Sequence, residues 1–479
     1  MYQSVIGLEI HAQLLTKTKL FCSCSTNFGE PPNKNVCPVC LGLPGALPVL
    51  NEEVVNFSIK LALALNMKIN LISRFSRKNY FYPDLPKGYQ ITQYDLPLAV
   101  GGYLELDGDR KVVIERINLE EDAGKSIHDG MPDSNKKTYL DFNRSGIPLI
   151  EIVTKPEIYS PEEAVQFVMK LRLILQYLEI CDGNMEEGSL RCDANVSQKK
   201  IGKEELGTKT EIKNLNSFKF LHKALEYEIK RQEELLNRGE KIFHETRLYD
   251  SSSGKTFPMR SKEEAHDYRY FPEPDLLPLR ISKDRIQLIK SNIPELPDSK
   301  RKRFREKYGI PSYDCEILTS SRLIADYFEE TVKYCKMPKN ASNWIMGEVL
   351  RYLNDENIDF NEFKLPPEYL AELIIRVENG EIPISVAKEI FPLMAREKKR
   401  VDEILQEKKI ELITDDERIR EIIEEVFKEN PLALKQLKEG KTQVISFLIG
   451  QVLKKMERKG NPNQIKRLLE KVLNEKHTE

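Results

Sequence analysis

With 479 residues, 40% of them hydrophobic and 31% charged, the chain exceeds one ordinary core and predicts roughly two to four folded domains. The formal net charge of -2 excludes a uniformly basic nucleic-acid binder, so any nucleic-acid contact needs a local patch. No apolar run approaches the roughly 18 residues of a membrane helix, and the N-terminus lacks a signal-peptide pattern. We therefore expect a cytoplasmic protein whose eight cysteines are thiols or metal ligands rather than disulfides.

Residues 1 to about 280 alternate between strand and helix patterns. The period-two alternation of residues 4–14 and 190–196 predicts half-buried strands. Helical spacing covers residues 52–65 and 161–178, and Ser160 stands where the second of these helices needs an N-cap. This half of the chain is therefore expected to mix strands and helices.

The pattern changes near residues 294–307, where a proline-containing stretch and the basic run 300–303 indicate a linker that leads into a helix. Beyond it helical periodicity dominates, for example in residues 342–353, 367–378 and 384–398.

The final part of the chain, from about residue 406, has an uneven charge. Residues 401–430 hold 5 basic and 11 acidic residues, whereas residues 431–479 hold 11 basic and 5 acidic ones. The amphipathic stretch 444–456 lies in the basic part, and basic side chains close it: Lys454, Lys455, Arg458 and Lys459. Both a solvated helix end and a patch that contacts a phosphate backbone fit this pattern.

Four cysteines form two close pairs, Cys22 with Cys24 and Cys37 with Cys40, separated by twelve residues. Thiolates are soft ligands that suit zinc, and zinc takes four of them in a tetrahedron. Four protein ligands leave no position for water, so such a zinc would be structural. The alternative is a loop with four free thiols. The other cysteines lack this spacing and are expected in the core: Cys181, Cys192, Cys315 and Cys335.

Two strand patterns place acids where a metal could bind. Alternation puts Glu9 and His11 on one face of the first strand, either as metal ligands or as a surface pair. Residues 147–153 are apolar on both faces except for Glu151, and a buried unpaired carboxylate is costly. Glu151 therefore needs a cation, hydrogen-bond donors or a structural ion pair.

Further charged side chains could join these acids. Glu120, Glu121 and Asp122 stand together at an expected strand end, and repel one another unless they are solvated or share a metal such as Mg²⁺. Residues 190–196 and 208–213 carry polar side chains on one strand face, which is either solvent-exposed or the floor of an active site. Acids that hold a metal, together with basic residues, would suit phosphoryl transfer.

The sequence also lacks familiar nucleotide and amidase patterns. Gly-Lys-Ser/Thr triplets begin at Gly124, Gly254 and Gly440, but none has the glycine that a P-loop needs five residues earlier. Any ATP must therefore bind to a different fold. No convincing glutaminase constellation is present, so ammonia for an amide product would come from solution or from a partner.

Nine motifs together resemble the GatB family, the B subunits of aspartyl/glutamyl-tRNA amidotransferases. They lie at residues 5–11, 77–84, 87–93, 120–126, 148–153, 186–195, 213–218, 267–275 and 342–347, and the likeness covers essentially the whole chain. The resemblance implies an α+β fold with three domains. These are a glutamine-synthetase-like cradle with a mixed or antiparallel sheet (1–292), an all-α helical domain (293–405), and a small helical YqeY-like tail (406–479) that contacts tRNA.

The resemblance also implies an ATP-dependent ligase activity. A member of this family uses ATP and Mg²⁺ to phosphorylate the side-chain carboxylate of Glu on tRNA(Gln) or of Asp on tRNA(Asn). A separate amidase (glutaminase) subunit supplies ammonia from glutamine, and a small third subunit makes the complex a heterotrimer. The cysteine cluster occurs in only some members, which supports a structural Zn²⁺ at Cys22, Cys24, Cys37 and Cys40.

Carried over residue by residue, the resemblance assigns catalysis and Mg²⁺ binding to Glu9, His11, Glu121 and Glu151. The roles of their neighbours Glu120 and Asp122 are not separated. Basic and polar residues are expected to contact phosphate or substrate: Lys87, Arg191, Asp193, Lys209, Arg260 and Arg269. Two alternatives remain, a non-enzymatic zinc-stabilised RNA-binding protein and a stand-alone ligase that acts on a free amino acid.

Overall fold

The computed structural model describes residues 2–127, 130, 132–133, 136–259, 268–410, 415–438, 443–456 and 459–478. The chain forms two compact units, Met1–Leu296 and Pro297–Glu479. The division lies four residues from the domain boundary expected at 292/293.

The first unit is built around a ten-stranded sheet with the order β15-β14-β13-β12-β1-β11-β8-β6-β2, in which β7 also pairs with β8. Neighbouring strands are antiparallel except for the parallel pair β13 and β14. The strands of this sheet are β1 (Tyr2–Gln13), β2 (Lys68–Ile69), β6 (Ala99–Val100), β7 (Tyr103–Glu105), β8 (Lys111–Glu121), β11 (Pro148–Thr154), β12 (Leu190–Lys200), β13 (Thr210–Lys213), β14 (Glu245–Asp250) and β15 (Lys255–Pro258).

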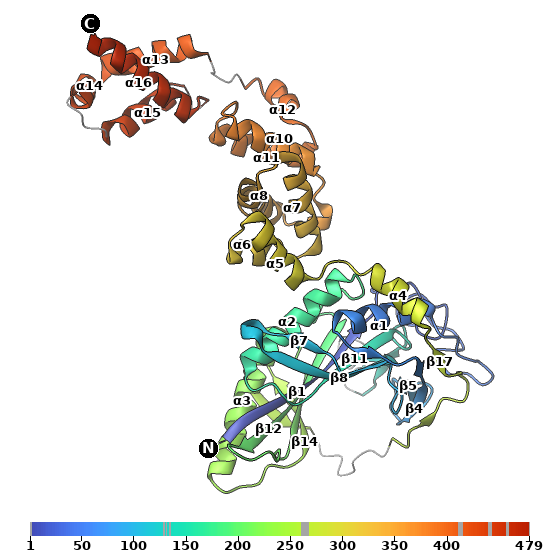
Figure 1. Cartoon of the computed structure of the whole chain (residues 1–479). Coiled ribbons are helices and arrows are strands. Elements are labelled where there is room, and N and C mark those ends of the chain that lie inside the picture. The colour runs from blue at the N-terminus through green and yellow to red at the C-terminus, as the bar shows by residue number, and fades with distance from the viewer. Residues whose placement is uncertain are drawn as a thin grey trace. The chain divides into compact units, whose positions relative to one another are not determined.

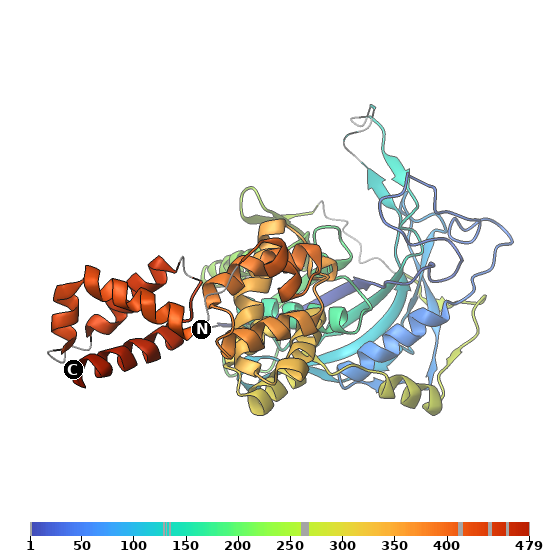
Figure 2. The same cartoon turned by 90° about the horizontal axis from the view of Figure 1, so that it is seen from above.

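Smaller sheets flank this one. Their strands are β3 (Ile72–Ser73), β4 (Phe75–Asn79), β5 (Tyr89–Gln93), β9 (Lys125–Ile127), β10 (Tyr139–Asp141), β16 (Phe271–Pro272) and β17 (Leu279–Arg280). The β9–β10 hairpin projects beside the loop that carries the cysteines, as Figure 2 shows. Asn33 of that loop fastens the two together, because its side chain donates to the carbonyl of Leu140 and accepts from the amide of Phe142.

The helices of this unit are α1 (Glu52–Ala64), α2 (Pro161–Tyr177), α3 (Phe218–Asn237) and α4 (Lys283–Ser291). Of these, the helices α1, α2 and α3 cover one face of the large sheet (Figure 1). Ser160 caps α2 as expected, since its hydroxyl accepts from the amide of Glu163 at 3.2 Å. Ile6, Leu8 and Ile10 of β1 are buried in one core with residues of the three covering helices. Burial of this face leaves the opposite face of the same strands for polar side chains.

The second unit is helical in its described residues. Its helices are α5 (Pro297–Tyr308), α6 (Ser312–Leu318), α7 (Arg322–Cys335), α8 (Pro338–Trp344), α9 (Leu350–Glu356), α10 (Pro367–Glu378), α11 (Ile384–Glu397), α12 (Val401–Glu407), α13 (Asp416–Glu429), α14 (Pro431–Lys438), α15 (Gln443–Lys455) and α16 (Pro462–Thr478). Helices α5 to α12 share one apolar core, and α13 to α16 share a second.

One expectation for this unit needs correction. The basic run 300–303 lies inside α5 rather than in a linker, because Phe304 anchors that helix in the core and Lys300 pairs with Asp326. The helix expected at 342–353 is confirmed, and it contains a π-helical turn, Ile345–Val349, between α8 and α9. The α+β fold class is confirmed. No helix in the described ranges is both long enough and apolar enough to cross a bilayer.

Candidate functional site

The polar face of the large sheet gathers side chains from four adjacent strands. Residues directly opposite each other in an antiparallel pair share a face. His11 of β1 lies opposite Arg191 of β12 and Glu151 of β11, and Glu9 lies opposite Asp193. The expectation that Glu9 and His11 share a strand face is confirmed by the 3.7 Å between the His11 Nε2 and the Glu9 carboxylate.

Three of these side chains form a compact group. Ligand atoms of Glu9, His11 and Glu151 all lie within 4.8 Å of one another. The His11 Nε2 is also 3.2 Å from the carboxylate of Glu120, and the amide of Asn118 donates to Glu151 at 2.6 Å. We call Glu9, His11, Glu120 and Glu151 the acidic cluster.

Glu121 does not join the acidic cluster, although the sequence grouped it with Glu9, His11 and Glu151. Successive side chains on a strand point to opposite faces, so Glu120 and Glu121 diverge. The Glu121 carboxylate accepts from the backbone amide of Ile91 at 2.9 Å and forms a buried ion pair with Lys87. The structure therefore places Glu120, whose role the sequence left unassigned, beside His11.

Crowding in the acidic cluster shifts the pKa values of His11, Glu120 and Glu151. Burial alone would lower the pKa of His11, but the hydrogen bond and charge of Glu120 raise it to about 9. Burial raises the pKa of Glu151, and the negative charges of Glu120 and Glu9 add to the effect, to about 7. Burial would also raise the pKa of Glu120, yet its contact with His11 lowers it overall. A bound cation would relieve this repulsion.

A cavity of about 390 Å³ opens onto the acidic cluster. Glu120 and Glu151 form part of its lining, and so do Lys78, Arg116 and Tyr270. The Lys78 ammonium lies over the Tyr268 ring, 4.8 Å from its centroid. Sequence reasoning did not select Lys78, Arg116 or Tyr270. Lys78 was missed because its strand, residues 75–79, is too short to show a clear alternation. Its contact with Tyr268 was missed because the two residues are far apart in the chain.

The other expected substrate residues lie in several places. Arg191 pairs with Asp122 at 3.0 Å, and Asp193 pairs with Lys213 at 2.7 Å, both on the polar face. Lys209 is exposed just before β13. The backbone carbonyl of Arg269 accepts from Asn79 at 2.9 Å, which places it next to β4. Arg260 lies outside the described residues.

The acidic cluster fits a hard divalent cation such as Mg²⁺. Three carboxylates and one imidazole offer a donor set that is mostly oxygen. The Oδ1 atom of Asn118 is buried beside Glu151 and has no hydrogen-bond partner in the described part of the chain. A carbonyl oxygen left in this way is a further donor for a cation or for water that a cation holds.

The four-cysteine loop forms a second group with metal-binding geometry. The Sγ atoms of Cys22, Cys24, Cys37 and Cys40 all lie within 4.8 Å of one another. Zn–S bonds of about 2.3 Å in a tetrahedron separate the sulfurs by about 3.8 Å. The Cys37 and Cys40 sulfurs are 3.9 Å apart, so the loop fits zinc. The remaining cysteines are buried as expected: Cys181, Cys192, Cys315 and Cys335.

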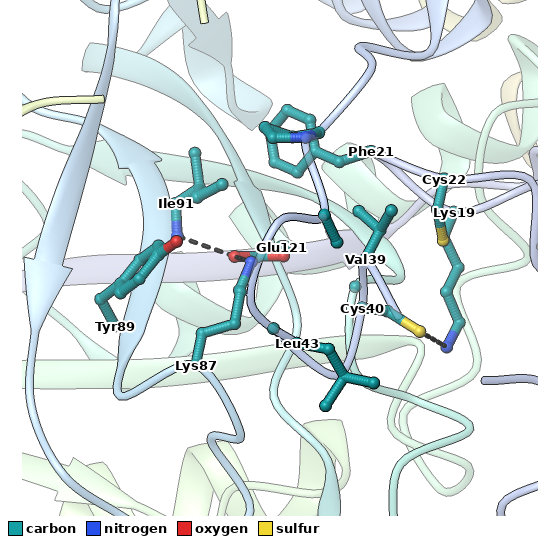
Figure 3. A pocket seen from close by; sticks show the side chains of 14 residues that line it. Lys19, Phe21, Cys22, Val39, Cys40, Leu43, Lys87, Tyr89, Ile91 and Glu121 are labelled. Atoms are coloured by element: carbon teal, nitrogen blue, oxygen red, sulfur yellow. Dashed lines mark hydrogen bonds and ion pairs between the residues drawn. The ribbon is translucent and has the colours of Figure 1, made fainter. Parts of the chain in front are cut away.

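A small cavity of about 100 Å³ separates the cysteine loop from the Lys87–Glu121 ion pair. Figure 3 shows Glu121 beside Lys87 and Ile91 on one side of it, and Lys19 beside Cys40 on the other. The acidic cluster is not part of its lining. Glu121 and Lys87 thus face the cysteine loop, whereas Glu120 faces the larger cavity.

Comparisons with known proteins cover both units. Residues 4–287 match the family model described as the GatB/GatE catalytic domain, and residues 326–473 match the GatB domain. The chain is 55% identical over 477 residues to the B subunit of the aspartyl/glutamyl-tRNA(Asn/Gln) amidotransferase of Thermodesulfovibrio yellowstonii, covering 99% of this chain and 100% of the relative. Proteins of the same name from Caldanaerobacter subterraneus and Thermotoga maritima are each 50% identical, covering 98% of this chain and 99% of the relative. The resemblance found in the motifs is confirmed, and the chain belongs to the GatB family.

Proposed function

We propose that this chain is the activating subunit of a tRNA-dependent amidotransferase. Its substrates would be Glu carried on tRNA(Gln), Asp carried on tRNA(Asn), or both, with ATP as phosphoryl donor. The observation that carries this proposal is the acidic cluster on the open face of the sheet, in a chain that matches the family along nearly its whole length.

The chemistry follows from the substrate. A side-chain carboxylate has no leaving group at neutral pH, and its negative charge repels a nucleophile. Transfer of the γ-phosphoryl group of ATP to a carboxylate oxygen gives an acyl phosphate and ADP. Ammonia then forms the C–N bond, the C–O bond to phosphate breaks, and phosphate and a proton leave. The products are Gln-tRNA(Gln) or Asn-tRNA(Asn).

Within this scheme the acidic cluster would hold Mg²⁺, and Mg²⁺ when bound neutralises phosphate charge. The described residues add positive charge around the same cavity, from Lys78 and Arg116 in its wall. Both could contact the phosphates or the substrate carboxylate. Arg191 lies on the same sheet face, but it also pairs with Asp122. It would therefore contact the phosphates or the substrate carboxylate with only part of its charge. Preorganised positive groups of this kind are how proteins stabilise a transferring phosphoryl group.

Partner subunits would supply the ammonia and complete the complex. A separate amidase subunit would release ammonia from glutamine, and a small third subunit would make the complex a heterotrimer. The tail would contact tRNA through the basic side chains at the end of α15, Lys454, Lys455 and Lys459, while Arg458 lies outside the described residues. Lys455 also pairs with Glu425 and Glu429, so it would share its charge. A cytoplasmic location remains part of the prediction. The four-cysteine loop would hold one structural Zn²⁺ per chain, distinct from the Mg²⁺ of the acidic cluster, and metal analysis would find about one zinc per chain.

The test is a reconstituted assay. The chain is copurified with its partner subunits and supplied with ATP, Mg²⁺ and glutamine, together with Glu-tRNA(Gln), Asp-tRNA(Asn) or the free amino acids. We expect amide formation that requires both ATP and the charged tRNA. Turnover of a free amino acid without tRNA would favour a stand-alone ligase instead. Binding of tRNA without any ATP-dependent amide would favour a non-enzymatic RNA-binding protein.

A further inference from the structure

Lys19 is a fully buried lysine whose side chain packs against the loop that carries Cys22, Cys24, Cys37 and Cys40. Its exposed fraction is 0%, and among the described residues no carboxylate forms an ion pair with it. Burying an ammonium group is costly unless an anion or several acceptors compensate it. The surroundings of Lys19 must therefore provide that compensation, and neither the sheet nor the acidic cluster does so.

Three acceptors surround the Lys19 Nζ. It donates to the backbone carbonyl of Asn35 at 2.7 Å and to that of Phe142 at 3.2 Å. The third is the Sγ of Cys40, at 3.6 Å, as Figure 3 shows. Two neutral carbonyls do not balance a full charge, whereas a thiolate does. The positive charge of Lys19 is thus directed at the sulfur cluster.

The backbone around Lys19 is fitted closely to the same cluster. The Lys19 amide donates to the carbonyl of Cys24 at 3.0 Å, which closes the turn that holds the first cysteine pair. Gly146 has a φ of +85°, and a Cβ there would lie 3.4 Å from the Lys19 side chain and 3.5 Å from that of Cys40. Ser145 donates to the Cys40 carbonyl at 3.3 Å. Lys19 therefore connects both cysteine pairs with the turn that leads into β11.

The charge of the metal centre explains why a lysine is needed there. Four thiolates around one divalent ion carry a net charge of -2. Removing that charge from water is expensive, and a cation close to the sulfurs lowers the cost. A single ammonium group beside Cys40, the buried member of the four, reduces the net charge of the centre to -1.

We propose that Lys19 is the charge-balancing and positioning residue of the four-cysteine metal centre. Lys19 and the metal stabilise each other, so the binding of the metal and the presence of the ammonium group are thermodynamically coupled. Lys19 also transmits the position of the loop to the turn 142–146 and hence to the start of β11. This proposal rests on zinc occupancy of the cysteines and not on the amidotransferase activity.

Metal retention by the full-length chain tests the proposal directly. Zinc-loaded wild type, Lys19→Met, Lys19→Arg and the exposed control Lys17→Met are titrated with a chromophoric chelator. Since the loss of partners around a metal site typically costs 10–100-fold in metal affinity, we expect Lys19→Met to bind zinc about 10–100-fold more weakly. Lys17→Met should match wild type, and Lys19→Arg, which keeps the charge, should lose less zinc than Lys19→Met. Wild-type zinc affinity in Lys19→Met, or equal losses in the Met and Arg variants, would overturn the charge-balancing role.

A double-mutant cycle separates the metal from a purely structural role. Thermal unfolding is compared for wild type, Lys19→Met, Cys24→Ser and the double variant, all with zinc present. If Lys19 acts through the metal centre, Lys19→Met lowers Tm in the intact cluster and much less in the Cys24→Ser background. An equal decrease in both backgrounds would show that Lys19 merely ties loops together, and would contradict the proposal.

Discussion

The imidazole of His11 contacts Glu120, with its Nε2 3.2 Å from the carboxylate, across two strands that are not neighbours in the sheet. β11 lies between them and adds Glu151 to the same face. The contact identifies which acid of the 120–122 group belongs to the acidic cluster. It also gives Glu120 and Glu121, which are adjacent on β8, different expected functions.

Substitution of these two glutamates should have different effects on the metal dependence of the reaction. Glu120→Gln removes a charge from the acidic cluster, so we expect a decrease in the amidation rate on the order of 10²-fold or more and a requirement for higher Mg²⁺. Glu121→Gln instead leaves Lys87 buried without a charged partner, which should cost about 3–5 kcal/mol of stability and leave the Mg²⁺ dependence unchanged. Rates measured against Mg²⁺ concentration, with thermal unfolding of each variant, distinguish the two. A shift in Mg²⁺ dependence for Glu121→Gln alone would contradict this assignment.

The first unit should also depend on a buried ion-pair network between α3 and the β14–β15 hairpin. The side chain of Glu228 is fully buried and accepts from Arg231, Gln232 and Thr256 at 2.6 to 3.0 Å. Glu228→Ala leaves these buried donors with one acceptor fewer and removes one ion-pair partner of Arg247, which keeps its pair with Glu245, so we expect a loss of about 1–3 kcal/mol.

Hydrogen exchange of the α3 and β15 amides measures this loss locally. Glu234→Ala, an exposed position on the same helix, serves as the control and should change stability by less than about 0.5 kcal/mol. Unchanged exchange in Glu228→Ala would show that the network does not hold the hairpin on α3.

The tail has its own apolar core, which includes Ile423, Val452 and Leu469 and is separate from the core of the helices before it. Deletion of residues 406–479 removes the end of α12 and Ile410 at the edge of the preceding core, but should leave the rest of that core in place. We expect it to weaken tRNA binding and to reduce the salt dependence of that binding, because phosphate contacts are lost. ATP hydrolysis should decrease less. Filter binding at several salt concentrations measures tRNA binding, and a phosphate-release assay measures ATP hydrolysis. Equal losses of tRNA binding and ATP hydrolysis would count against a dedicated tRNA contact in the tail.

Much of the fold could be predicted because the signals are local. Alternation along residues 4–14 and the apolar run around Glu151 locate two central strands and the polar face. The spacing of the cysteine pairs is likewise local, and the structure brings the four sulfurs together.

The rest depends on contacts between distant residues. At the end of β8 three acids are consecutive. Strand alternation separates Glu120 from Glu121, but the buried partners of Glu121 are supplied by β5 and Lys87, which the local sequence does not reveal. Lys78 reaches the cavity because the segment with Tyr268 and Tyr270 returns to β4, nearly 200 residues later in the chain. The π-helical turn at Ile345–Val349 has no periodic signature, because one extra residue shifts a helix without changing its composition.

The central claim is that the acidic cluster activates the substrate carboxylate, and substitution of Glu151 tests it most directly. Glu151→Gln keeps the shape of the side chain and an acceptor for Asn118 but removes its charge, and Glu105→Gln, at the exposed end of β7, is the matched control. Both are assayed in the reconstituted complex for amide formation and for phosphate release that depends on charged tRNA. We predict that Glu151→Gln lowers both rates on the order of 10²–10³-fold, while Glu105→Gln leaves them unchanged. Full amide formation by Glu151→Gln would contradict the account.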